Sequence, residues 1–91
     1  MAKRERGRRA LQDEVSRRIQ HIYEIGEDGA TIHVPAPVPH ARDTRGRNWD
    51  MNGFGNATGY EASIRTVVDE VRDEFDLNES LENRAPNPFG D

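Results

Sequence analysis

Residues 58–77 read TGYEASIRTVVDEVRDEFDL, and this stretch decides the fold. Its apolar side chains recur at steps of three or four, which is the spacing of one face of an α-helix. They are Tyr60, Ile64, Val67, Val68, Val71 and Phe75. Thr58 and Glu61 have the spacing of a capping box, in which two side chains satisfy backbone amides at a helix start. The stretch therefore predicts an amphipathic helix over about residues 59–76, with Leu77 packing just beyond it.

A shorter pattern of the same kind lies near the N-terminus. Leu11, Val15, Ile19 and Ile22 follow one another at steps of four, four and three, so they share one stripe of a helix. We expect a helix over about residues 9–23, closed by Gly26, because glycine readily adopts the left-handed conformation that ends helices. In the alternative, residues 21–25 form a strand and residues 26–29 form the turn of a hairpin.

Between the two predicted helices, the segment 31–38 alternates in the manner of a strand. Its apolar face consists of Ile32, Val34, Ala36 and Val38. Prolines at positions 35, 37 and 39 lack an amide donor, so we expect an edge strand that then leaves the sheet. Residues 40–47 are expected to form a loop, and residues 48–51 a second short strand that brings Trp49 and Met51 to the core. Glycine and asparagine crowd residues 52–59, which predicts an irregular loop.

The chain has 91 residues, which suffices for one small domain, and only 33% of them are hydrophobic. We predict a single α+β domain over about residues 9–77. It would contain an N-terminal amphipathic helix, one or two short strands and a long C-terminal amphipathic helix. Residues 1–8 have almost nothing apolar to bury, so a flexible basic arm is expected there. Residues 78–91 have few apolar side chains and net negative charge, which predicts a disordered acidic tail.

The composition argues against several classes of protein. No cysteine is present, which excludes a disulfide scaffold and a thiolate metal site. No long apolar run follows the basic N-terminus, so we expect neither a signal peptide nor a membrane span, and a cytoplasmic setting is predicted. His33, His40 and Asp43 are the only plausible metal set, and three prolines between the histidines argue against it. Because nucleophile and nucleotide-binding motifs are absent, we expect no enzyme activity, no cofactor and no small-molecule substrate.

Charge is sorted along the chain, although its net value is only −4. Residues 1–18 carry seven basic and three acidic side chains, whereas residues 61–91 carry nine acidic and three basic ones. The basic side chains of the arm are Lys3, Arg4, Arg6, Arg8 and Arg9. Such a cluster can neutralise phosphates, which makes a nucleic-acid-associated factor the alternative function. Against it, the arm holds no aromatic side chain to stack on bases, and a solvated terminus is the simpler interpretation.

A second candidate site lies in the segment 42–51. Arg42, Arg45, Arg47 and Trp49 combine the residue types that most often dominate protein interfaces, which predicts a protein-interaction site. In the alternative, Trp49 anchors the core, because a small domain needs the large apolar area of its single tryptophan inside.

Self-association is the best-motivated mode of interaction. The predicted core is thin, and a lone strand needs either residues 48–51 or a second copy of the chain to pair with. A two-fold dimer would supply that edge. We therefore predict a small non-enzymatic protein-interaction or regulatory protein whose partner is itself or another protein.

Overall fold

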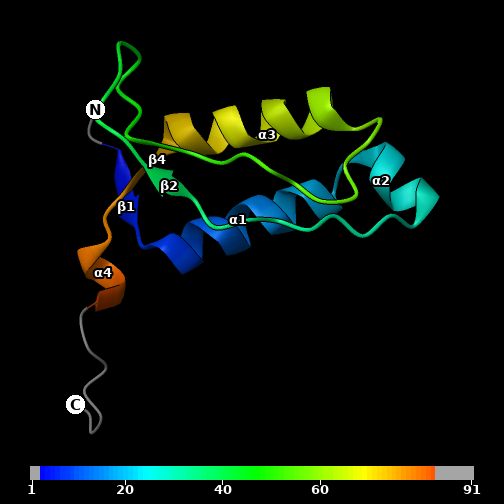
Figure 1. Ribbon diagram of the computed structural model, residues 1–91, viewed down its shortest axis with the longest axis horizontal. Coiled ribbons are helices and arrows are strands. Elements are labelled where there is room, and N and C mark those ends of the chain that lie inside the picture. Colours follow the sequence, from blue (N-terminus) through cyan, green and yellow to red (C-terminus); the bar gives the residue numbers. More distant parts are fainter. Residues whose placement is uncertain (1–2, 84–91) are drawn as a thin grey trace, which may run out of the picture.

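Two packed helices and two pairs of short strands build a small α+β domain (Figure 1). The computed structural model describes residues 3–83. Its elements in chain order are β1 (Arg4–Arg6), α1 (Arg8–Gln20), α2 (Tyr23–Asp28), β2 (Val38–Pro39), β3 (Trp49–Asp50), α3 (Glu61–Glu74), β4 (Phe75–Leu77) and α4 (Ser80–Asn83). Figure 1 shows the strands at one end of the helix pair and α2 at the other.

The core lies between α1 and α3, whose apolar faces pack against each other. As the two periodic patterns predict, the buried residues of α1 are Leu11, Val15 and Ile19, and the buried apolar residues of α3 are Ile64, Val67, Val68 and Val71. Trp49 and Met51 fill the space beside α3 and are also buried, as predicted for the second short strand. At the surface, Arg18 of α1 donates hydrogen bonds of 2.8 and 3.1 Å to the carboxylate of Glu74. The two helices are thus joined by both apolar and ionic contacts.

Helix α3 begins two residues later than the capping pattern predicts. Gly59 has a φ of 94°, which turns the chain before the helix, and the N-cap is Tyr60 without a side-chain cap bond. The Glu61 carboxylate accepts a hydrogen bond of 2.9 Å from the amide of Gly59, one residue after the Thr58 amide that the predicted capping box would use. The expected role of Thr58 as the cap is therefore wrong.

The N-terminal helix is interrupted where the sequence predicts continuity. Helix α1 ends at Gln20, Ile22 is extended, and a separate short helix α2 follows. The interruption changes the direction of the chain, and Ile25 of α2 therefore packs in the core. Gly29, with a φ of 64°, ends α2 in place of the expected Gly26, and the alternative hairpin over residues 21–29 does not form.

The segment 31–38 is not one continuous strand. His33 forms an isolated antiparallel bridge with Gly55, and only Val38–Pro39 pairs as β2 with β3. The prolines explain the gap, because they remove amide donors between the two paired points. Beyond Val34 the alternation of burial is lost, and Val38 is exposed while Pro37 is buried. Both pairings lie within the chain, so this segment needs no second copy.

Residues 4–6 form strand β1, which corrects the prediction of a flexible arm over residues 3–8. Strand β1 lies parallel to β4, with Arg4 opposite Phe75 and Arg6 opposite Leu77. Because the backbone rather than the side chains makes this pairing, a segment without apolar residues still finds a place in the fold. Residues 1 and 2 lie outside the described part.

Side chains close the other edge of β4. The side-chain NH₂ of Asn48 donates to the Leu77 carbonyl, and the side-chain oxygen of Asn48 accepts from the backbone amide of Leu77, both at 3.0 Å. The indole of Trp49 donates to the Phe75 carbonyl at 3.0 Å. These two side chains therefore satisfy backbone groups of β4 that would otherwise need a third strand as hydrogen-bond partner.

The ordered region also extends past Leu77. Helix α4 occupies Ser80–Asn83, so the disordered tail predicted over residues 78–91 is wrong for residues 78–83, and residues 84–91 lie outside the described part. Within residues 3–83, no helix is long and apolar enough to cross a membrane.

Candidate functional site

The segment 40–47 forms a tight loop that joins β2 to β3. The Asp43 amide donates to the Arg47 carbonyl at 2.9 Å, and the Asp43 carboxylate accepts from the amides of Arg45 and Arg47. Gly46, with a φ of 80°, makes the turn. The backbone amide of Arg47, followed by that of Arg45, holds the pKa of Asp43 below its ordinary value. The loop is thus a built element with its own hydrogen bonds.

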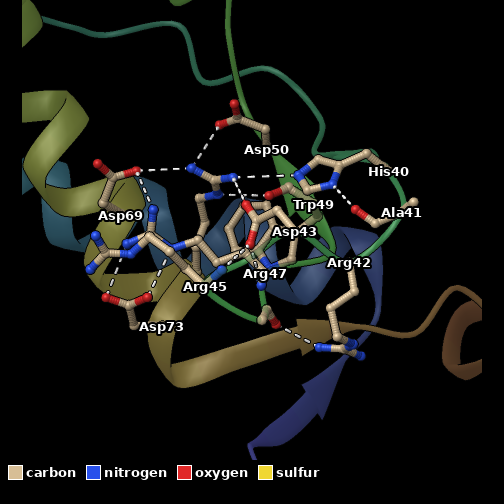
Figure 2. Close-up of polar contacts among 12 residues, drawn as sticks. His40, Ala41, Arg42, Asp43, Arg45, Arg47, Trp49, Asp50, Asp69 and Asp73 are labelled. Atoms are coloured by element: carbon tan, nitrogen blue, oxygen red, sulfur yellow. Dashed lines mark hydrogen bonds and ion pairs between the residues drawn. The ribbon is translucent and has the colours of Figure 1, made fainter.

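Arg47 leaves this loop and crosses to helix α3. Its guanidinium donates to both carboxylate oxygens of Asp73, at 2.8 and 3.1 Å (Figure 2). This two-bond geometry is the strong form of an arginine–carboxylate pair. The hydrogen bond from Arg47 lowers the pKa of Asp73, and the same bond raises the pKa of Arg47. Since Arg47 is only 8% exposed, its positive charge is paired within the molecule and little of it reaches solvent.

Arg72 of α3 is the centre of a second ionic cluster. Its Nε donates to the Trp49 carbonyl at 2.7 Å, and its terminal nitrogens lie 3.1 to 3.8 Å from carboxylates on α3, β3 and the loop. Those carboxylates belong to Asp69, Asp50 and Asp43. His40 also contacts the guanidinium, at 3.4 Å from Nη2. Arg72 is 8% exposed, so this cation joins three chain segments from an almost buried position.

The predicted protein-interaction residues therefore separate into two groups. Trp49 has no exposed area and Arg47 is nearly buried, so neither offers a surface to a partner, and Trp49 has the alternative role of core anchor. Arg42 and Arg45 remain on the surface. Arg42 donates to the carboxylate of Asp76 at 3.0 Å, and this bond raises the pKa of Arg42.

Lys3 attaches the basic N-terminal segment to this network. Its ammonium donates to the carbonyls of Gly46 and Arg72, both at 2.9 Å, and lies 3.4 Å from the Asp76 carboxylate. The Arg72 carbonyl is in the last turn of α3, where a cation is favoured. Lys3 thus links the first described residue to the loop and to the end of α3.

The remaining basic residues of this segment face solvent. Arg4 and Arg6 lie over the Phe75 ring, with their guanidinium carbons 5.9 and 5.0 Å from its centre. Arg8 and Arg9 are exposed in the first turn of α1, and Arg8 lies 3.7 Å from Glu79. We call Arg4, Arg6, Arg8 and Arg9 the basic face. All four are on regular elements, so the cluster has a defined shape.

Two hollows accompany these features. One, of about 550 Å³, lies between α1 and the segment 31–36 and begins at Arg8 and Arg9. The other, of about 520 Å³, lies at the start of α3 and is more apolar, with Met51, Phe54 and Ile64 in its lining.

The histidines of the rejected metal set lie in different surroundings. His33 is held by its bridge to Gly55, whereas His40 contacts Arg72. In the part of the chain that the structure describes, no three histidine, aspartate or glutamate side chains are grouped as a metal ion would require.

Comparison with protein-family models found no match, and searches of curated proteins and of solved structures found no similar chain either.

Sequence reasoning missed Arg72 and the groove beside α1. The spacing of Asp69 to Arg72, and of Arg65 to Asp69, is the i,i+3 and i,i+4 spacing of helix ion pairs and was a usable signal. No such signal marks the groove, because its two walls are distant in sequence and each wall alone has the pattern of an ordinary surface.

Proposed function

We propose that this chain is a non-enzymatic protein-interaction or regulatory protein that contacts an acidic region of a protein partner through the basic face. The observation that carries the proposal is the exposure of Arg4, Arg6, Arg8 and Arg9 on ordered elements. The contrast with Arg47 and Arg72, whose charges are used inside the molecule, supports it. A cytoplasmic setting belongs to the same proposal.

The placement of Arg8 and Arg9 gives further support. The N-terminal end of a helix favours acidic side chains, and a cation there is unfavourable by a few tenths of a kcal/mol to about 1 kcal/mol. Helix α1 has no acidic residue in its first turn. Helix stability therefore does not account for these arginines, and recognition of an anionic partner is the role that we propose for them.

The net charge of −4 does not oppose this proposal. At physiological ionic strength, charges in water are screened over about 8 Å. The molecule measures 42 Å along its longest axis, so an acidic partner at the basic face is screened from distant carboxylates. The local charge therefore decides the contact.

A titration with poly-L-glutamate at low salt tests the proposal. We expect fluorescence anisotropy or NMR shifts to show binding, with a several-fold loss for the double variant Arg4→Ser and Arg6→Ser. Arg45→Ser is the matched control, because Arg45 is an exposed arginine that does not belong to the basic face. Equal losses for both variants, or no binding at all, would show that the basic face is not the contact surface.

Nucleic-acid binding remains the alternative function, since the same four arginines suit phosphates. A duplex DNA or an RNA of matched charge in the same titration separates the two. Tighter binding of the nucleic acid, with a steep dependence on salt, would favour the alternative.

A homodimer is also part of the proposal, on the argument that the core is thin. The second argument, an unpaired strand at residues 31–38, no longer applies, because the pairing lies within the chain. Light scattering over a range of concentrations gives the mass directly. A chain that stays at 10.3 kDa would exclude self-association.

A further inference from the structure

A groove of about 550 Å³ runs between α1 and the segment 31–36, which passes beside α1 on its way from α2 to β2 (Figure 1). The helix wall presents one face of α1, and its lining residues are Arg8, Arg9, Gln12, Asp13 and Ser16. The opposite wall is chain with few backbone pairings of its own. The groove therefore joins a helix surface to a backbone edge.

That edge has unsatisfied backbone groups. The amide and carbonyl of His33 both pair with Gly55, at 2.9 and 3.0 Å, so the polar groups of the neighbouring residues point the other way. The Val34 carbonyl confirms this direction, because it accepts a hydrogen bond of 2.8 Å from Gln12 of α1. Within residues 3–83, the amides of Ile32 and Val34 have no hydrogen-bond partner. Two donors are thus available at the groove.

Charge varies along the groove. Arg8 and Arg9 lie at one end, and Asp13 lies on the next turn of the same helix. The contact between Arg8 and Glu79 is 3.7 Å long with both side chains about half exposed, and such a pair is easily exchanged for another. The groove thus offers positive charge at one end beside an open backbone edge.

We propose that this groove binds an extended acidic peptide segment of a partner protein, which adds a short strand along Ile32–Val34 and places its carboxylates at Arg8 and Arg9. The inference rests on the proposed function and specifies the site and the form of the partner. Pairing is limited to residues 31–34, because the Val34 carbonyl is already bonded to Gln12. Strand addition of this kind supplies affinity through the backbone and specificity through the side chains.

A peptide fits this edge better than a nucleic acid does. At this edge Ile32 is buried and Val34 is half-buried. It presents the amides of both residues together with the carbonyl of Ile32, so a partner must both accept and donate. A peptide backbone alternates acceptors and donors at matching intervals. A phosphate backbone offers acceptors alone, so it would leave the carbonyl unpaired.

The test uses a short fluorescein-labelled peptide of alternating aspartate and valine, with an alternating aspartate and proline peptide as its control of equal charge. We expect the first to bind more tightly, because each of its valines supplies an amide donor that the prolines of the control lack. In amide NMR spectra of the intact chain, the Ile32 and Val34 signals should shift downfield and exchange more slowly with solvent. Equal affinities for the two peptides, or no change at these amides, would overturn the proposal.

Variants on one helix test the charge. Replacing Arg8 and Arg9 together by serine should weaken binding about tenfold, and Asp13→Asn should strengthen it about two- to threefold. Arg17→Ser is the matched control, because Arg17 is exposed on α1 outside the groove, and it should leave the affinity unchanged. An effect of Arg17→Ser as large as that of the double variant would show non-specific attraction and overturn the proposal.

The outcomes separate this inference from the proposed function. Binding of poly-L-glutamate that perturbs the amides of β1 but not those of Ile32 and Val34 would keep the basic face and reject the groove. Absence of binding to any acidic probe would reject both. A duplex DNA that displaces the peptide and perturbs Ile32 and Val34 more strongly would reject the peptide as the partner.

Discussion

The loop at residues 40–47 and the N-terminal segment at residues 3–9 are both rich in arginine, but their guanidinium groups contact different things. Arg47, with Arg72 of α3 beside the loop, is almost buried and bound to carboxylates. Arg4 and Arg6 of the N-terminal segment lie exposed over an aromatic ring. The difference teaches that arginine content alone does not mark a site, because the position of the opposing carboxylates decides which arginines remain available.

The same comparison explains the sorted charge of the chain. Basic residues near the N-terminus meet acidic residues near the C-terminus within one molecule, in the pairs Lys3–Asp76, Arg8–Glu79 and Arg18–Glu74. Part of the charge asymmetry is therefore neutralised by folding. Arg4 and Arg6 instead lie over the Phe75 ring and stay exposed.

The largest loss of stability is expected when Trp49, which follows the loop and is buried in the core, is replaced. Trp49→Ala removes a fully buried side chain and its hydrogen bond to the Phe75 carbonyl, so we expect a loss of about 3–5 kcal/mol in the free energy of unfolding. Urea denaturation followed by circular dichroism measures it. Arg45→Ala, on the exposed loop, serves as the control and should change stability by less than about 0.5 kcal/mol. A loss below about 1 kcal/mol for Trp49→Ala would contradict the core role.

A smaller loss is expected when the central cation is removed. Arg72→Met keeps most of the side-chain volume but removes the cation that three carboxylates share and the hydrogen bond to the Trp49 carbonyl. Because these carboxylates are partly exposed and can regain water, we expect a loss of about 1–3 kcal/mol. Urea denaturation again measures the change. An unchanged stability would mean that the ionic cluster has no net structural role.

Acid should weaken the ion pairs that join α3 to the loop and to α1. Folding lowers the pKa of Asp73 through the hydrogen bond from Arg47, and that of Glu74 through the bond from Arg18. Groups with a lowered folded pKa bind more protons when unfolded, so their stabilisation is present above the ordinary carboxyl values of 3.8 and 4.5 and is lost as the pH falls below them. Melting temperatures between neutral pH and about pH 2.5 should show this fall. The variant Asp73→Asn should reduce its size, and an unchanged profile for that variant would contradict the role of the Arg47 pair.

The smallest effect on stability is expected at the basic face. Arg4→Ser together with Arg6→Ser removes two contacts with the Phe75 ring, each worth about 0.5–1 kcal/mol at an exposed site, while the backbone pairing of β1 with β4 is kept. We therefore expect a loss of at most about 2 kcal/mol in urea denaturation, accompanied by the several-fold loss of affinity for poly-L-glutamate. Unfolding of the chain by this pair of substitutions would remove the distinction between the two regions.

Local periodicity predicted much of the fold. The apolar steps of Leu11, Val15 and Ile19, and those of Ile64 through Val71, identified the two packing faces, because a buried helix face must be apolar whatever it packs against. The same reasoning placed Trp49 and Met51 in the core, although the strand that forms there contains only Trp49–Asp50. Helix ends were less predictable, and Gly59 and Ile22 show why. The backbone conformations of Gly59 and Ile22 depend on how the residues after them pack, and that packing involves distant parts of the chain.

The candidate site could be predicted only in part. The exposed arginines of the N-terminal segment were recognised from composition. That they lie on an ordered strand was not predicted, because β1 forms through backbone hydrogen bonds to β4, which lies about 70 residues later in the sequence. The loop arginines were assigned to a partner, whereas Arg47 pairs with Asp73 of α3, a residue of the same chain.

The sequence by itself determined the two amphipathic helices, the small α+β domain and the unequal distribution of charge, since each is a property of neighbouring residues. Only the tertiary structure decided which arginines are paired, that β1 belongs to the fold, and that α1 and the segment 31–36 form a groove. The physical reason is that helix and strand patterns repeat over a few residues. Ion pairs, strand partners and grooves instead depend on the distance between segments that the chain brings together from far apart.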